Sequence, residues 1–135
     1  MVTVHITYQG DLHCEAVHEP SGAVLATDPP KDNHGKGEQF SPTDLVAAAL
    51  GTCILTVMGI AARTLNVDLR GAKATAVKEM TAVPLRRIGK IAVTVRIPAT
   101  VSEEQKQKLE RAALTCPVHQ SLHPDIEMPI EFIWG

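Results

Sequence analysis

The stretch FSPTDLVAAALGTCILTVMGIAARTL, residues 40–65, decides how this chain of 135 residues folds. Its start carries three signals of a helix N-terminus. Ser41 can cap the first turn, Pro42 suits the first helical position, and Asp44 places a negative charge near the positive end of the helix dipole. We therefore expect a long helix that begins at Pro42 and ends near Leu65.

No charged residue occurs from Leu45 to Ala62, a run of eighteen residues, which is close to the minimum length of a membrane-spanning helix. The run is poor membrane material, because it contains Gly, Thr and Cys, five alanines, no Trp or Tyr belt and no basic loop that would fix an orientation. A helix that is apolar on every side must then be buried by protein, and a chain of this length has little material to surround it. We expect an obligate homodimer and no membrane partner.

Residues before this helix alternate between apolar and polar side chains, which is typical of strands with one solvent-facing side. Three short strands are predicted, at residues 2–8, 12–16 and 23–26. The segment DPPKDNHGKGEQ, residues 28–39, is rich in Pro, Gly, Asn and Lys. We expect a long loop there without a helix, and loops of this length are often functional.

Residues after the helix predict more strands and a second helix. The expected strands are 67–80, 88–97 and 126–134, the last of them an edge strand or one with a bulge because it contains Pro129. Ser102 and Gln105 form a capping box that starts the second helix, which ends near Thr115. The predicted order is strands, a long helix, two strands, helices and a last strand, in one domain over residues 1–135.

Composition excludes several classes of partner and location. Thirteen Lys and Arg against fifteen Asp and Glu give a formal charge of -2, so no basic field exists to attract nucleic acid or an anionic membrane. Three cysteines are too few for the disulfide framework of a secreted protein, and the start MVTVHITYQG lacks the features of a signal peptide. We expect a cytoplasmic protein.

Two cysteines occupy helices in different ways. Cys53 lies about three turns inside the long helix, on a row with Val46, Ala49, Leu50, Val57, Ile60 and Ala61, and is expected to face apolar surroundings without help from a helix terminus. Cys116 precedes Pro117 and is expected to cap a third, short helix, whose free N–H groups would lower the pKa of its thiol. The alternative is that both are small core residues, as is expected for Cys14 on the apolar face of a strand.

The segment FSPTDLVAAALGTC, followed 63 positions after its cysteine by the cysteine of TCPVHQSL, resembles the OsmC/Ohr family of osmotically induced and organic-hydroperoxide-resistance proteins. The similarity covers essentially the whole chain. It implies an α+β fold, with antiparallel sheets wrapped around a long central helix in an intertwined homodimer, without a metal or an organic cofactor. It also implies a peroxidatic thiol at Cys53, a resolving thiol at Cys116 and a disulfide between them after turnover.

One part of the family pattern differs in this chain. The family's peroxidases activate the thiol with an N-terminal arginine and with a glutamate ten positions before the cysteine. Thr43 occupies the second position here, and no arginine precedes Arg63. The candidates that could take over are loop residues or arginines that reach across a dimer interface: His34, Lys36, Glu38, Arg86, Arg87 and Arg111.

The function predicted from the resemblance is a cytoplasmic thiol peroxidase in oxidative stress defence. It would reduce organic hydroperoxides, with hydrogen peroxide as a second candidate substrate, and an external dithiol would reduce the Cys53–Cys116 disulfide. The alternative is a slow redox-sensing dimer, or one that binds a small hydrophobic ligand without catalysis. His119 and His123 are spaced for a metal, but no further ligand accompanies them, so no metal is expected.

Overall fold

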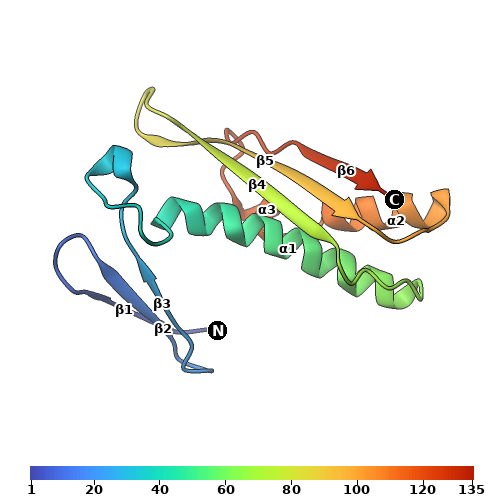
Figure 1. The fold of residues 1–135 in the computed structure, drawn as a ribbon, viewed down its shortest axis with the longest axis horizontal. Coiled ribbons are helices and arrows are strands. Elements are labelled where there is room, and N and C mark those ends of the chain that lie inside the picture. The colour runs from blue at the N-terminus through green and yellow to red at the C-terminus, as the bar shows by residue number, and fades with distance from the viewer. The chain divides into compact units, whose positions relative to one another are not determined.

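The computed structural model describes residues 1–135 and has the predicted α+β class (Figure 1). The chain forms two compact units, Met1–Val46 and Ala47–Gly135. Each unit contains one three-stranded sheet. A single domain over residues 1–135 stays a prediction.

The first unit contains an antiparallel meander of β1 (Val4–Tyr8), β2 (Cys14–His18) and β3 (Val24–Thr27). The second strand begins two residues later than predicted. Asp11 and Leu12 have positive φ angles of 51° and 63° and belong to the turn that follows Gly10. Leu12 therefore lies outside the strand, although the alternation of apolar and polar residues begins there.

The loop after β3 contains one turn of 3-10 helix, η1 (Lys31–Asn33). The prediction that residues 28–39 contain no helix is therefore wrong for these three residues. The Pro30 carbonyl accepts hydrogen bonds from the N–H groups of Asn33 and Gly35, both at 2.9 Å. A Cβ on Gly35 would lie 1.5 Å from the Pro29 carbonyl oxygen. The loop can close this tightly only because glycine has no side chain.

The central helix α1 (Pro42–Thr64) has the predicted start and end. The Ser41 hydroxyl accepts from the Asp44 N–H at 3.1 Å, and the Asp44 carboxylate accepts from the Ser41 N–H at 2.9 Å. At the other end Asn66 has a φ of 58° and the Val67 N–H donates to the Ala62 carbonyl, which is the Schellman pattern. By length and apolar composition alone, α1 would also qualify as a membrane span.

The second unit contains a mixed sheet in the order β4-β5-β6. Its strands are β4 (Lys73–Thr81), β5 (Arg87–Ile97) and β6 (Ile130–Trp134). β4 and β5 are antiparallel, whereas β5 and β6 are parallel, because two helices intervene and return the chain to the same end of the sheet. β6 pairs with one neighbour only, so the edge position indicated by Pro129 is confirmed.

Two of the predicted strands are shorter than expected. The first was predicted from residue 67 and begins at Lys73, because residues 67–72 form a turn in which Gly71 has a φ of 90° and the Ala72 N–H bonds to the Leu69 carbonyl. The last was predicted from residue 126 and begins at Ile130, although an isolated bridge pairs Glu127 with Lys90.

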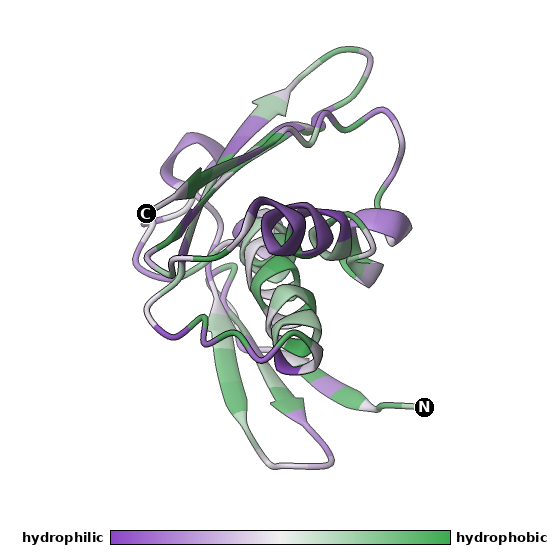
Figure 2. Ribbon diagram, turned by 90° about the vertical axis from the view of Figure 1, so that its right-hand side faces the viewer, coloured by the Kyte–Doolittle hydropathy of each residue, from purple (hydrophilic) through white to green (hydrophobic).

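Two helices lie between β5 and β6 in the chain. The helix α2 (Glu103–Ala113) begins with the predicted capping box of Ser102 and Gln105, and α3 (Pro117–Ser121) follows it. Figure 2 shows the contrast between the mostly apolar α1 and the polar α2. Leu109 and Ala113 are the buried residues of α2.

The core of the second unit lies between α1 and the sheet. Gly51 of α1 lies beside Ala74 of β4, and alternate residues of β5 are buried. The buried positions of α1 are Ala47, Leu50, Gly51, Ile54, Met58 and Ala62. The predicted row through Cys53 is covered only in part: Leu50 is completely buried and Cys53 is half-buried, whereas Ile60 is 62% exposed. A helix that is apolar on all sides does not reveal from its sequence which side faces the sheet.

Candidate functional site

Cys116 is held at the start of α3, as predicted. A residue before proline avoids helical angles, and Pro117 occupies the first turn of α3. The Cys116 sulfur accepts a hydrogen bond from the His119 N–H at 3.4 Å. No part of the residue is exposed to solvent, so it is reachable only by groups already packed around it.

The second cysteine of the pair, Cys53, lies in the middle of α1 and is half-buried. The two thiols are neighbours in the fold, because Cys53 is among the groups that raise the pKa of Cys116. Both thiols are free. The fold therefore brings together the two site residues named from the sequence, although 63 positions separate them, whereas Cys14 belongs to the strand β2 of the other unit.

The pKa of the Cys116 thiol is raised above its ordinary value, which corrects the expectation that the helix terminus would lower it. Burial is the largest cause, and the hydrogen bond with Cys53 acts in the same direction. The N–H groups of His119 and Val118 act in the opposite direction and are outweighed. The helix α3 has only five residues, so its dipole is short, whereas the desolvation of a fully buried thiolate is large.

Three arginines were candidates to replace the family's activating residue. Arg111 lies on α2 and its Nε donates to the carbonyl of Gln107 on the same helix. Arg87 begins β5 and donates to the Ile88 carbonyl, and Arg86 lies exposed in the connection before it. His34, Lys36 and Glu38 belong to the first unit. The positions of these six residues do not identify which of them replaces the activating arginine.

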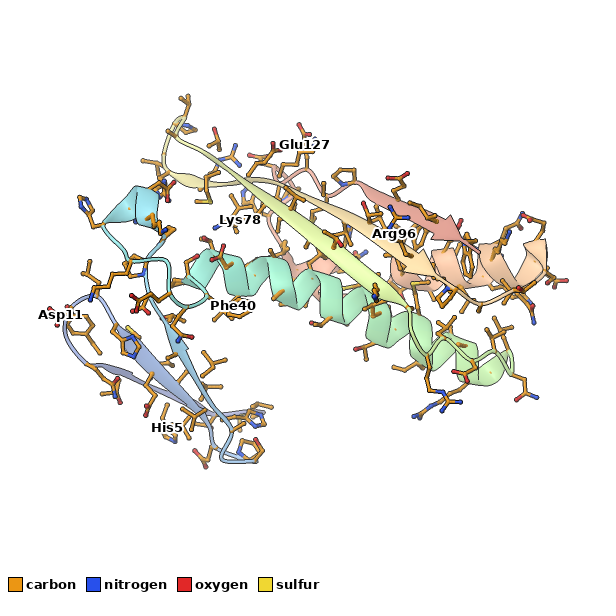
Figure 3. All side chains as sticks on the ribbon, in the orientation of Figure 1. His5, Asp11, Phe40, Lys78, Arg96 and Glu127 are labelled. Atoms are coloured by element: carbon orange, nitrogen blue, oxygen red, sulfur yellow. The ribbon has the colours of Figure 1, made fainter.

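Lys78 is a cation that the sequence interpretation missed; it is labelled in Figure 3. It lies in β4 opposite Ile91, which is completely buried. It shares a strand face with Ala74, which contacts Gly51 of α1. The alternation of Ala74, Ala76, Lys78 and Met80 was the signal that could have found it, because a lysine at such a position faces the helices.

The second unit has hollows of ligand size on its surface. One of about 570 Å³ lies between α2 and β6 and is lined by Gln107, Glu110, Arg111, Leu114, Met128, Ile130 and Phe132. A second of about 450 Å³ lies at the C-terminal end of α1, where Leu55, Met58 and Ala62 line it. Neither hollow is lined by Cys53 or Cys116. No group of three or more His, Cys, Asp or Glu side chains is arranged to hold a metal ion.

The chain is similar in sequence to a family of known proteins and in fold to solved structures. The family model for OsmC-like protein matches residues 35–131. A search of curated proteins returns no match. Among solved structures, a candidate osmotic stress induced and detoxification response protein from Psychrobacter arcticus 273-4 is 42% identical with a TM-score of 0.92, over 98% of this chain and 96% of that one.

More distant structures share the fold. An organic hydroperoxide resistance protein OsmC from Legionella pneumophila is 15% identical with a TM-score of 0.80, over 98% of this chain and 96% of that one. An organic hydroperoxide resistance protein from Elizabethkingia anophelis, with thiocyanate bound, is 17% identical with a TM-score of 0.78, over 100% of this chain and 98% of that one. With the two cysteines in contact and the family model matching 97 residues, 35–131 inclusive, this chain belongs to the OsmC-like protein family.

Proposed function

We propose that this protein is a cysteine-dependent peroxidase that reduces organic hydroperoxides in defence against oxidative stress. The observation that carries the proposal is that the two free thiols of Cys53 and Cys116 are near enough for Cys53 to raise the pKa of Cys116, although 63 positions separate them in the chain. A disulfide between two neighbouring thiols is the oxidised state that such a peroxidase cycle requires. Family membership and the names of the organic hydroperoxide resistance proteins that share the fold support it.

The reaction needs two steps at the thiols and a third outside them. The Cys53 thiolate attacks the terminal oxygen of ROOH, the O–O bond breaks, and ROH leaves with a proton, so Cys53 becomes a sulfenic acid. The Cys116 sulfur then attacks the Cys53 sulfur, the S–S bond forms, and water leaves with the Cys116 proton. An external dithiol reduces the disulfide and restores both thiols.

The unequal burial of the two thiols supports this order of roles. Cys53 is half-buried, whereas Cys116 is completely buried, so a substrate from solvent reaches Cys53 first. The residues beside Cys53 on the same face of α1, Ala49, Leu50 and Val57, are apolar, which suits an organic hydroperoxide better than a charged substrate. No metal or organic cofactor and no nucleic acid enters this cycle.

The proposed working form is a cytoplasmic homodimer. Only six of the 23 residues of α1 are buried, although the helix is apolar along most of its length. The strand β1 exposes Val4, Ile6 and Tyr8 at 44%, 65% and 63%. Apolar surface of this extent in a small chain is typical of an obligate interface, and a second copy of this chain is the proposed occupant.

A second candidate function is the binding of a small hydrophobic ligand, with slow or no turnover at the thiols. The hollow of about 570 Å³ between α2 and β6 favours it, because Leu114, Met128, Ile130 and Phe132 supply apolar walls. This volume is in the range of small-molecule sites, about 300–1,000 Å³.

A hydroperoxide-consumption assay separates the two functions. Cumene hydroperoxide and an excess of a dithiol reductant are mixed with the wild type, with Cys53→Ser and with Cys14→Ser as a matched cysteine control. The peroxidase predicts that the wild type and Cys14→Ser consume hydroperoxide equally, while Cys53→Ser is reduced to the background rate. A wild type no faster than free cysteine would reject the peroxidase and favour the ligand-binding protein.

A further inference from the structure

The hollow of about 450 Å³ lies where the C-terminal half of α1 meets the turn that leads into β4 (Figure 1). Apolar side chains from both segments line it: Leu55, Met58, Ala62, Val67 and Leu69. A smaller hollow of about 360 Å³ adjoins it and shares several of its lining residues. The polar and charged residues of the smaller hollow are Arg63, Asn66, Asp68 and Arg70. Together the two hollows form a site with an apolar end and a charged end.

Gly59 leaves space in the apolar end of this site. It lines the hollow from the interior of α1, where glycine is less favourable than every residue except proline. Neither of the usual reasons for a glycine applies to it. It is not among the glycines with a positive φ, and a Cβ built on it would meet nothing within 4 Å. The missing side chain therefore serves no turn and no close approach of the backbone, but it does keep the hollow open.

The charged end contains one cation without a partner. The Arg70 guanidinium donates to both oxygens of the Asp68 carboxylate, with the shortest distance 2.7 Å, so these two charges neutralise each other. The guanidinium of Arg63, which is exposed, forms no ion pair and no hydrogen bond. One positive charge is left over, which suits a ligand with one negative charge. A doubly charged ligand would be repelled by Asp68 without a second free cation to offset it.

We propose that this site binds a small aliphatic monocarboxylate, with the alkyl chain in the apolar hollow and the carboxylate on the Arg63 guanidinium. A guanidinium can donate two parallel N–H bonds to one carboxylate. Apolar walls with a few polar groups are typical of small-molecule sites, and the volume is in their range of about 300–1,000 Å³. Neither cysteine of the thiol pair lines this hollow, so the inference goes beyond the proposed peroxidase.

Three probes with the same alkyl chain test the ligand class: octanoate, octan-1-ol and octylammonium differ in the charge of the headgroup. Each is titrated into the full-length wild type with its thiols reduced. Binding is followed by the methyl NMR signal of Met58, which lines the hollow. We expect octanoate to bind about tenfold more tightly than octan-1-ol, the effect of a hydrogen bond to a charged group, and octylammonium to bind most weakly. Equal affinities for octanoate and octan-1-ol, or no shift of the Met58 signal, would overturn the proposal.

Two arginine variants separate the role of Arg63 from a general effect of charge. Arg63→Gln removes the unpartnered cation, so octanoate should lose about tenfold in affinity while octan-1-ol is unaffected. The matched control is Arg96→Gln, because Arg96 lies on the solvent-facing side of β5 and is labelled in Figure 3. It should leave both affinities unchanged. If octanoate binding falls equally in the two variants, or in neither, Arg63 does not hold the carboxylate and the proposal fails.

Gly59→Leu tests the apolar end and also the possibility that a second copy of this chain fills the hollow. Its side chain would occupy the hollow, so both octanoate and octan-1-ol should bind at least tenfold more weakly, while sedimentation shows the same mass as for the wild type. Dissociation of this variant into monomers would assign the hollow to the second copy and overturn the proposal. The titrations need no peroxide turnover, so their outcome is independent of the hydroperoxide-consumption assay.

Discussion

Replacing Gly51 with alanine should stabilise the protein, although Gly51 is buried in the middle of α1 and lies against the sheet. A Cβ built at this position meets only the Cβ of Ala74, at 3.8 Å, which is an ordinary van der Waals contact. Alanine therefore fits without displacement of β4. Glycine in a helix interior costs about 1 kcal/mol relative to alanine, and burial of the added methyl group contributes about 0.8 kcal/mol more.

The matched control is Gly59→Ala in the same helix. A Cβ at Gly59 meets nothing within 4 Å, so this variant gains the helix propensity without the packing contact. We expect an increase in the free energy of unfolding of about 1 to 2 kcal/mol for Gly51→Ala and about 1 kcal/mol for Gly59→Ala. For a domain of this size the larger change raises the Tm by about 5 °C.

Thermal unfolding followed by circular dichroism measures both changes. All variants are compared at one protein concentration, because dissociation of a dimer couples to unfolding. If Gly51→Ala loses stability, or gains less than Gly59→Ala, then α1 does not approach β4 at Ala74 in the way described. The register of the helix on the sheet, which also sets the position of Cys53, would then be wrong.

Three further predictions concern the assembly and the thiols. Sedimentation at micromolar concentration should give about twice the chain mass of 14.5 kDa, because α1 is left largely uncovered, and a folded monomer would contradict the homodimer. One equivalent of hydroperoxide should link Cys53 to Cys116 and leave Cys14 free, and peptide mapping that finds Cys14 in the bridge would reject the pairing. Burial and the hydrogen bond with Cys53 raise the pKa of Cys116, so the protonated thiol is favoured in the folded state. Its contribution to the free energy of unfolding is then complete below the ordinary thiol pKa of about 8.5 and is lost as the pH rises through the raised value. Denaturation of the wild type and Cys116→Ser at a series of pH values should show their stability difference change only above pH 8.5, and a change centred at lower pH would refute this.

The sequence best predicts structural features that depend on residues close together in the chain. The start of α1 at Pro42, its end before Asn66 and the capping box of Ser102 all follow from short-range hydrogen bonds and backbone preferences, and all are confirmed. The strand predicted from residue 67 shows the limit of such signals. Val67 and Leu69 are apolar and alternate, but Gly71 takes a positive φ and the segment forms a turn.

The sequence predicts less well what depends on packing between distant segments. The alternation of apolar and polar residues in β6 predicted which side chains share a face of the strand. It did not predict that β6 pairs with β5 in parallel. The row predicted through Cys53 contains the buried Leu50 but also the exposed Ile60, because most sides of that helix are apolar and the contact with β4 selects the buried side. The contact between Cys53 and Cys116 was expected through the family resemblance, since nothing in a spacing of 63 residues brings two side chains together.

The roles of the two thiols depend on how a short helix dipole compares with burial. A charge at a helix terminus gains about 0.3–1 kcal/mol at an exposed site, whereas burial disfavours the thiolate and so raises the pKa of a thiol. At Cys116 the terminus is that of a five-residue helix and the burial is complete, so burial outweighs the dipole and the thiol keeps its proton. The N–H groups that were expected to lower the pKa of Cys116 are therefore outweighed, and Cys116 stays protonated beside Cys53. Attack and resolution then follow from burial in the same order that the family resemblance implies.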